Sequence, residues 1–459
     1  MTSQIQTQTL FDELASQIPS MMEHFHVPGV ALGLIYGEQE FRAAFGVTNL
    51  ENPLPVNSAA LFQIGSISKT VAATAMMRLV ERGLVDLDAP IRRYLPELRL
   101  ADPTTAERVT LRHIFNHSGG WMGDFFDDAG LGDDALDVVV RRMDRLPQIT
   151  PLGELYSYNN AGYYLAGRVI EVVTGQTYED AARQLVLAPL GMDTSFYFAR
   201  DAITYRVAAG HDAVYPGDPR QPAVLRPWWL ARVSNSLGGL NSCVDDMLRY
   251  ARLHLGDGQV GGQPFLTPAS LAAMHRPAFP AANGEFVGVS WFVRQVGAVR
   301  IVRHGGATNG QQATLQMAPD RQFAILVLTN SDRGGELIRP LVEQALRSFL
   351  GAEDRQPQPL PADPQQLARY VGCYQGAAED LLLELVDGDL RLTYLPKGGF
   401  PTPDAPPQPA PPPTRLALTG PDQALALDEP SQGDQAEFLR APDGRLAWLR
   451  FGGRLHRLV

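Results

Sequence analysis

The sequence predicts an α+β domain followed by a smaller all-β domain. Short apolar runs of strand type occur at residues 28–47 and again at 286–330. Between them, from about 66 to 260, apolar residues recur mostly at helical spacing. Strands at both ends of a helical middle are typical of one domain whose sheet is completed by segments that are distant in the sequence. Beyond residue 364 the pattern is almost wholly β.

Individual elements of the first domain, which we place at 1–350, follow from local patterns. Residues 28–47 alternate apolar runs around a glycine-containing turn, which predicts a β-hairpin. Two segments, Val71–Arg82 and Gly162–Val173, have helical periods and are each followed by a glycine. The apolar run Phe323–Leu328 is long enough for one buried strand, and a helix is expected over 335–350.

The second domain is expected at 365–459, after a linker at 351–364 that is rich in proline and polar residues. Hairpins are predicted at 381–395, turning at an Asp-Gly pair, and at 438–458. A proline-rich stretch at 396–413 favours a mobile loop. These features predict a small barrel.

Composition narrows the class of protein. The 459 residues are 45% hydrophobic and 19% charged, as in ordinary globular proteins. A net charge of −11 argues against nucleic acid or an anionic membrane as the main partner. No apolar stretch approaches the roughly 18 residues of a membrane span. Two cysteines cannot form a disulfide framework, and the first twenty residues show no secretory signal. We therefore expect a soluble, cytoplasmic protein.

Lysine is almost absent. Of the 39 cationic residues, only Lys69 and Lys397 are lysines. Arginine cannot lose its proton in a protein, whereas a buried lysine can. Lys69 follows Ser66 by three residues at the start of a predicted helix, so the two side chains share a face. A serine hydroxyl becomes a nucleophile when a neighbouring base takes its proton. The alternative is a solvated lysine, which the positive end of the helix disfavours.

Two further segments carry candidate residues. Tyr158 and Asn160 form a Tyr-x-Asn pattern before a helix, where a phenol can move protons and an amide can hold a carbonyl. His304 precedes two glycines at the end of a predicted strand, where free backbone N–H groups can form an oxyanion hole. Each pattern alone also fits an ordinary turn.

The three motifs in this order resemble those of the serine β-lactamase and penicillin-binding-protein-like hydrolase superfamily, in its class C, D-aminopeptidase and family VIII esterase-like branch. The resemblance covers roughly residues 15–350. It is carried also by runs such as Val27-Pro-Gly-Val-Ala31, Gly83-Leu-Val-Asp-Leu-Asp-Ala-Pro-Ile91, Val109-Thr-Leu-Arg-His-Ile-Phe-Asn-His-Ser-Gly119, Ser236-Leu-Gly-Gly-Leu240 and Leu328-Thr-Asn330. It implies an antiparallel sheet flanked by helices plus an all-helical region. The tail resembles the lipocalin-like C-terminal domains of some relatives.

The resemblance implies a role for each residue. Ser66 is the acylated nucleophile, Lys69 its base or proton relay, and Tyr158 a second acid or base. Asn160 anchors a carbonyl group. His304 stands where the family usually has a lysine, facing Tyr158, and histidine is only partly charged near neutral pH. This argues against efficient β-lactam hydrolysis.

The resemblance also implies an oxyanion hole. Its donors are the backbone N–H groups of Ser66 and of Ala307, which directly follows Gly306.

Other features are set aside. His113 and His117 have a spacing that could hold zinc, but there is no obvious third ligand and no His-Glu-x-x-His pattern, so no metal is expected. The acidic stretch Asp124–Asp137 is interpreted as a solvated flap over the cleft. Together with the aromatic residues Trp121, Phe125 and Phe126, this flap is expected to line the substrate entrance.

These observations predict a serine hydrolase that cleaves small esters or amides and peptides through an acyl-enzyme, without a cofactor. Esterase and D-stereospecific peptidase activities stay open, as do β-lactamase and DD-peptidase activities. From another class, an inactive small-molecule-binding protein is the alternative. The acyl and leaving groups, the role of the β domain and the oligomeric state are left open by the sequence.

Overall fold

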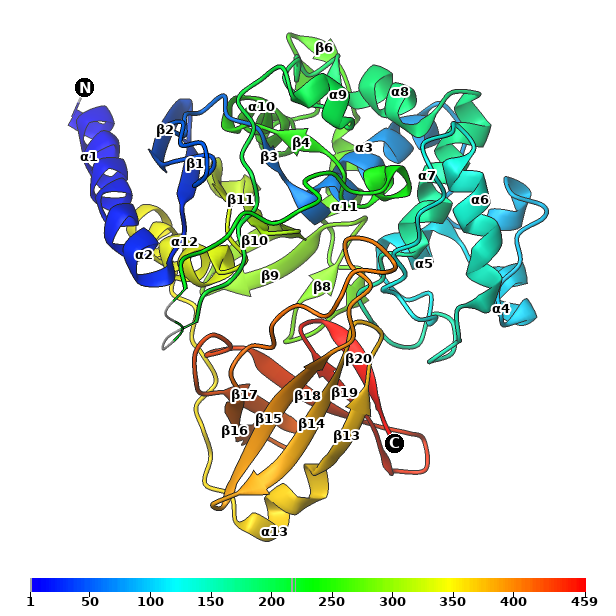
Figure 1. Ribbon diagram of the computed structural model, residues 1–459. Coiled ribbons are helices and arrows are strands. Elements are labelled where there is room, and N and C mark those ends of the chain that lie inside the picture. Colours follow the sequence, from blue (N-terminus) through cyan, green and yellow to red (C-terminus); the bar gives the residue numbers. More distant parts are fainter. Residues whose placement is uncertain (1, 216–217, 219) are drawn as a thin grey trace.

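A computed structural model describes residues 2–215, 218 and 220–459. Its centre is an eight-stranded antiparallel sheet with strands in the order β2-β1-β12-β11-β10-β9-β8-β7 (Figure 1). The bounds are β1 (Gly29–Tyr36), β2 (Gln39–Gly46), β7 (Phe279–Pro280), β8 (Phe286–Val287), β9 (Phe292–Val296), β10 (Val299–Thr308), β11 (Gln311–Ala318) and β12 (Phe323–Thr329). The first strand pairs with the last of these, with Val30 opposite Thr329. The predicted closure of the sheet by distant segments is confirmed.

Helices cover both faces of this sheet. One face packs against α1 (Thr2–Ser16), α2 (Ile18–Phe25) and α12 (Gly334–Leu350), which lie together at one side in Figure 1. The other face packs against α3 (Ser68–Glu81) and α10 (Val244–Leu255). The remaining helical elements of this side are α4 (Pro103–Arg108), α5 (Leu111–Phe115), α6 (Ala135–Arg141), α7 (Gly162–Thr174), α8 (Tyr178–Ala182), α9 (Ala199–Ala202) and α11 (Pro268–His275).

The helical side holds the largest apolar core. Its central helix α3 is buried along most of its length. The small and apolar side chains of the helix itself, mainly Ala, Thr and Met, allow neighbouring elements to pack against it on nearly every face. Such a helix is enclosed by protein on all sides, unlike a surface helix with one apolar stripe. Short strands β3 (Phe62–Gln63) and β4 (Asn241–Ser242) pair just before it, and β5 (Gln259–Val260) pairs with β6 (Gln263–Pro264). In the described part of the chain, no helix is long and apolar enough to cross a bilayer.

After α12 and the short helix α13 (Pro364–Leu367), eight strands form a closed antiparallel barrel. They are β13 (Gly372–Gln375), β14 (Glu379–Val386), β15 (Asp389–Pro396), β16 (Thr414–Gly420), β17 (Gln423–Ala426), β18 (Gln435–Arg440), β19 (Leu446–Phe451) and β20 (Arg454–Leu458). Closure comes from Tyr374 opposite Leu458. Alternate residues such as Leu381 and Leu383 fill the interior, as the period of a strand requires. The predicted α+β fold with a second, all-β barrel is confirmed; the boundaries at 351–364 stay a prediction.

Candidate active site

Ser66 lies in a tight turn between β3 and α3. The turn is a 3₁₀ helix over Gly65–Ile67, so Ser66 precedes the α-helix that was expected to contain it. Gly65 has φ +54°, and a Cβ atom there would lie 2.6 Å from the Ala307 nitrogen. Only glycine combines this left-handed backbone with so close an approach. The turn therefore brings Ser66 directly against the end of β10.

The approach is equally close from the strand. A Cβ atom on Gly306 would lie 1.9 Å from the Ile64 carbonyl oxygen and 3.1 Å from the Ser66 nitrogen. Glycine at 306 thus lets β10 approach the turn, and the contact of the two backbones involves the nitrogens of both Ser66 and Ala307. This is the arrangement in which two N–H groups can share one carbonyl oxygen.

Lys69 is fully buried beneath the nucleophile. Its Nζ lies 2.7 Å from Asn160 Oδ1, 2.8 Å from the carbonyl oxygen of Leu237 and 3.0 Å from Ser66 Oγ. Burial, together with the charge of Arg454, lowers the pKa of Lys69 well below 10.5. A neutral amine has two N–H bonds and one lone pair. Because the two carbonyl oxygens can only accept, the lone pair is left for the hydroxyl hydrogen of Ser66.

The orientation of Asn160 is set from the other side. Its Nδ2 donates to Asp124 Oδ1 at 2.7 Å, so its Oδ1 is the atom that faces Lys69. Asp124 is in turn held by Arg454 from the first residue of β20, at 2.5 Å and 3.2 Å. Burial alone would raise the pKa of Asp124, but the charge and hydrogen bonds of Arg454, together with the hydrogen bond from Asn160, lower it overall. A chain of contacts therefore runs from the barrel through Asp124 and Asn160 to Lys69.

This chain corrects the expectation of a solvated flap at Asp124, whereas residues 130–134 of the same stretch are exposed as expected. Asp124 is buried, with 5% of its side chain exposed, because the barrel supplies its cation. Trp121 is also buried, whereas Phe126 does line a cavity beside the nucleophile. Its ring lies 4.8 Å from that of Phe400, which belongs to the proline-rich segment after β15. In Figure 1 this segment is the orange loop that extends from the barrel to the first domain.

Tyr158 lies between Lys69 of the first domain and the barrel. Its ring is 5.0 Å from Lys69 Nζ, and its backbone nitrogen donates to the Gly453 carbonyl oxygen of the barrel at 2.9 Å. Burial raises the pKa of Tyr158, and the neighbouring Ser66 hydroxyl opposes that rise. The ring stacks on His117 with centroids 4.4 Å apart. His117 thus supports the candidate phenol, a contact that the spacing of His113 and His117 did not suggest.

His304 faces Tyr158 with ring centroids 6.4 Å apart. Its Nδ1 lies 2.6 Å from the Gly305 carbonyl oxygen. Burial, with the nearby Lys69, lowers the pKa of His304 to about 3. The expectation of a partly charged histidine is therefore wrong, because the ring is neutral at physiological pH. Among the described residues no group of His, Cys, Asp and Glu could hold a metal ion.

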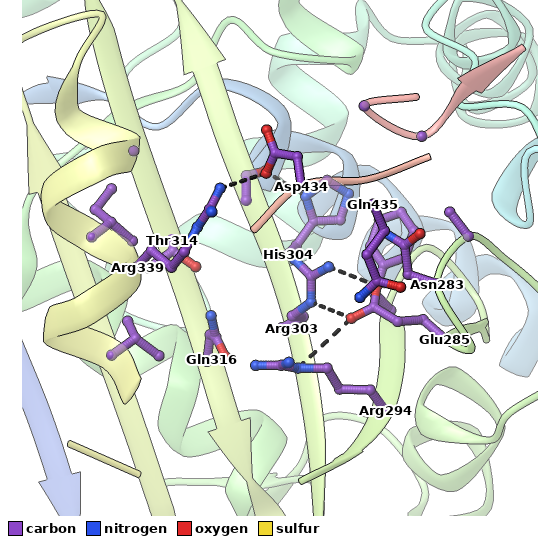
Figure 2. Close-up of a pocket in the computed structure, with 18 of the residues that line it drawn as sticks. Asn283, Glu285, Arg294, Arg303, His304, Thr314, Gln316, Arg339, Asp434 and Gln435 are labelled. Carbon is purple, nitrogen blue, oxygen red and sulfur yellow. Dashed lines mark hydrogen bonds and ion pairs between the residues drawn. The ribbon is translucent and has the colours of Figure 1, made fainter. Parts of the chain in front are cut away.

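Two cavities meet at Ser66. The smaller, of about 340 Å³, is lined by Asn160, Phe126 and Phe400. The larger, of about 800 Å³, contains His304 and extends over the sheet beneath the barrel, where Figure 2 shows charged and amide side chains pointing into it. Arg454 and Tyr158 line both. The nucleophile is thus reachable from a largely apolar side and from a polar side.

The sequence of this chain is similar to those of known proteins. The family model described as Beta-lactamase matches residues 14–346. The chain belongs to the beta-lactamase family of serine hydrolases. It is 32% identical to Penicillin-binding protein 4 of Amycolatopsis lactamdurans, over 77% of this chain and 94% of that protein. It is 29% identical to Esterase EstB of Burkholderia gladioli, over 68% of this chain and 88% of the esterase.

Solved structures extend the likeness to the barrel. The crystal structure of SurE has a TM-score of 0.75 at 24% identity, and the match covers 99% of this chain and 100% of SurE. A class C beta-lactamase from Rhodobacter sphaeroides has a TM-score of 0.61 at 22% identity and covers 74% of this chain. The fold of nearly the whole chain, barrel included, is thus found in one solved structure, and the fold of about three quarters of the chain in another.

Proposed function

We propose that this member of the beta-lactamase family hydrolyses small esters, or amide bonds of peptides, through an acyl-enzyme on Ser66. The observation that carries the proposal is the environment of Lys69. Its Nζ is enclosed by two carbonyl oxygens and Ser66 Oγ, with a pKa held well below the ordinary value. A protein that only binds ligand has no use for a buried neutral lysine beside a serine, and burying that amine costs free energy.

Acylation follows from this arrangement. Ser66 Oγ attacks the substrate carbonyl carbon while its proton passes to Lys69 Nζ. The developing oxyanion accepts from the Ser66 and Ala307 N–H groups, each worth about 3–4 kcal/mol in comparable enzymes. Tyr158, a neutral phenol because its pKa is raised, donates its proton to the leaving oxygen or nitrogen. Lys69 then returns a proton to Tyr158, which restores both groups.

Deacylation uses the same residues. Water attacks the acyl carbon, its proton passes to the Lys69–Tyr158 pair, and Ser66 Oγ leaves with a proton from that pair. Asn160 keeps Lys69 in place throughout through its carbonyl oxygen. No step requires a metal or an organic cofactor.

The charge of the site supports neutral substrates. His304 is neutral and Arg454 is already paired with Asp124, so neither offers a free positive charge to a substrate carboxylate. This favours esters and blocked peptides over β-lactams, whose carboxylate needs a cation. Relatives named as an esterase and as a penicillin-binding protein are consistent with either acyl chemistry.

The test is covalent labelling followed by a substrate panel. A fluorophosphonate should add one adduct, mapped by mass spectrometry to Ser66 and not to the neighbouring Ser68, and Ser66→Ala should abolish it. Nitrophenyl esters or D-aminoacyl anilides should then be turned over, and nitrocefin much more slowly. Lack of an adduct together with lack of turnover of every substrate would overturn the proposal.

A further inference from the structure

The larger cavity continues from the nucleophile around the edge of β10 onto the face of the sheet that carries α12. Neighbouring residues of a strand point to opposite faces, so His304 and Arg303 lie on different sides of β10. Both line the same cavity. The pairing of β9 with β10 ends with Phe292 opposite Arg303, and a Cβ atom on Gly305 would meet only the Ala313 carbonyl oxygen, at 3.7 Å. The cavity therefore passes from one face of the sheet to the other beside Gly305 and Gly306, which have no side chains to block it.

Beyond this passage lies a region that we call the sheet-edge groove. Its polar side chains come from β9, β10, β11, α12 and the segment before β8, and the barrel contributes Asp434 and Gln435 (Figure 2). Among them are Glu285, Arg294, Arg303, Thr314, Gln316 and Arg339. Because Arg303 and Gln316 are directly opposite in the β10–β11 register, their side chains share the floor of the groove.

The charges of the groove are balanced. Arg303 donates to both carboxylate oxygens of Glu285, at 2.8 Å and 2.6 Å, and Arg294 Nε lies 3.7 Å from the same carboxylate. Arg339 is 2.5 Å from Asp434 of the barrel. Each arginine therefore already has a carboxylate nearby. Such a surface does not select a highly charged ligand, and it suits a neutral ligand with hydrogen-bonding groups.

Two buried polar atoms of the groove are left without a hydrogen bond. Within the part of the chain that the structure describes, Gln316 Oε1 has no donor, and Arg294 Nε has only the ion-pair contact with Glu285 at 3.7 Å. Gln316 is 8% exposed. Buried polar groups in proteins are nearly always hydrogen-bonded, so the free acceptor of Gln316 in a cavity indicates a ligand that offers a donor, and Arg294 Nε can donate to a closer partner than Glu285. A peptide backbone offers an N–H and a C=O group at every residue.

We propose that the sheet-edge groove is a subsite for an extended, uncharged peptide segment of the substrate, with Gln316 as its principal acceptor. The inference rests on the proposed function and names its substrate class as peptidic. Gln312 and Gln316, four residues apart on β11, both line the cavity. At about 3.3 Å per residue this is about 13 Å, the length of about four extended peptide residues.

Substrate length tests the proposal. Acetyl-alanyl nitrophenyl esters with one to four alanines extend the acyl side. Acetyl-alanyl peptides whose leaving group is a chain of one to four alanines ending in an amide extend the other side, each in L and D series. On one of the two sides kcat/KM should rise at least about tenfold between one and four residues. In Gln316→Leu this gain should fall by at least about fivefold, the loss expected for one hydrogen bond. Gln344→Leu, which changes a glutamine on α12 outside the groove, should keep the full gain.

A binding measurement separates this inference from the proposed function. In the Ser66→Ala full-length protein, a fluorescein-labelled alanine tetrapeptide amide should bind, and adding Gln316→Leu should raise its Kd at least about threefold. Turnover without any dependence on length, or without any effect of Gln316→Leu, would overturn the groove and leave the acyl-enzyme intact. Absence of peptide binding to Ser66→Ala would overturn it as well. Absence of a Ser66 adduct would overturn the acyl-enzyme, whereas peptide binding that depends on Gln316 would still support the groove.

Discussion

The two walls of the candidate active site are built from parts of the chain that differ in their separation along the sequence. On one wall, Ser66 and Lys69 are three residues apart and meet through one turn of backbone. On the other, Asp124 and Arg454 are 330 residues apart and meet only because the barrel docks on the first domain. In the proposed mechanism the first wall supplies the nucleophile and its base. The second sets the orientation and the electrostatics of those groups, through Asn160.

The largest effect is expected on the first wall, from Lys69→Arg. Arginine keeps the positive charge but cannot give up its proton, so it cannot take the proton of Ser66. We expect kcat/KM for a nitrophenyl ester to fall at least about 10³-fold, within the range for loss of a general base. Lys397→Arg is the matched control, since that lysine is 40% exposed and paired with Asp380. Near-normal activity of Lys69→Arg would contradict the role of a neutral lysine.

A smaller loss is expected for Tyr158→Phe, which removes the phenolic proton and keeps the ring that stacks on His117. The expected fall in kcat/KM is about 10²-fold for anilides, whose leaving nitrogen must be protonated. Nitrophenyl esters, with a better leaving group, should lose less. Tyr156→Phe, two residues away, should change either rate less than about threefold. Equal losses for esters and anilides would argue against proton donation by Tyr158.

Changes in the second wall are expected to lower kcat/KM least. Their clearest effect is expected on the pH dependence of the reaction rate. Arg454→Met should lower kcat/KM about tenfold, the order of one charge-assisted contact. The positive charge of Arg454 lowers the pKa of Lys69, and Asp124 raises it. Removing Arg454 therefore raises the pKa of Lys69, and the pH–rate profile should move to higher pH.

Arg445→Met provides the control for this variant, because that barrel arginine is 83% exposed and pairs only locally with Asp443. A tenfold loss in Arg454→Met with an unmoved pH profile would show that the residue acts on stability alone. The same loss in Arg445→Met would show that the loss in Arg454→Met comes from replacing a barrel arginine in general and not from the contact with Asp124.

The comparison also explains what could be predicted from the sequence. The fold class and the barrel were predictable because hairpins and helices leave local periods, such as the run Phe323–Leu328 that became β12. Ser66 and Lys69 were predictable as a pair because their contact spans one helical turn. Asp124 was placed in solvent because its cation, Arg454, lies in another domain, and no local pattern reports that contact. The neutrality of His304 depends likewise on burial, which a three-residue motif does not contain.

The most direct test of a neutral Lys69 is the pH dependence of Ser66 phosphonylation by a fluorophosphonate, in which Ser66 Oγ displaces fluoride from phosphorus, measured by intact-mass spectrometry at short times. A lowered pKa means that the amine is already deprotonated, and able to accept the Ser66 proton, well below pH 10.5. The phosphonylation rate constant should therefore rise with pH and level off well below that value. A rate constant that is still rising through pH 10.5 would show that Lys69 has the pKa of an ordinary lysine and would contradict its role as the base.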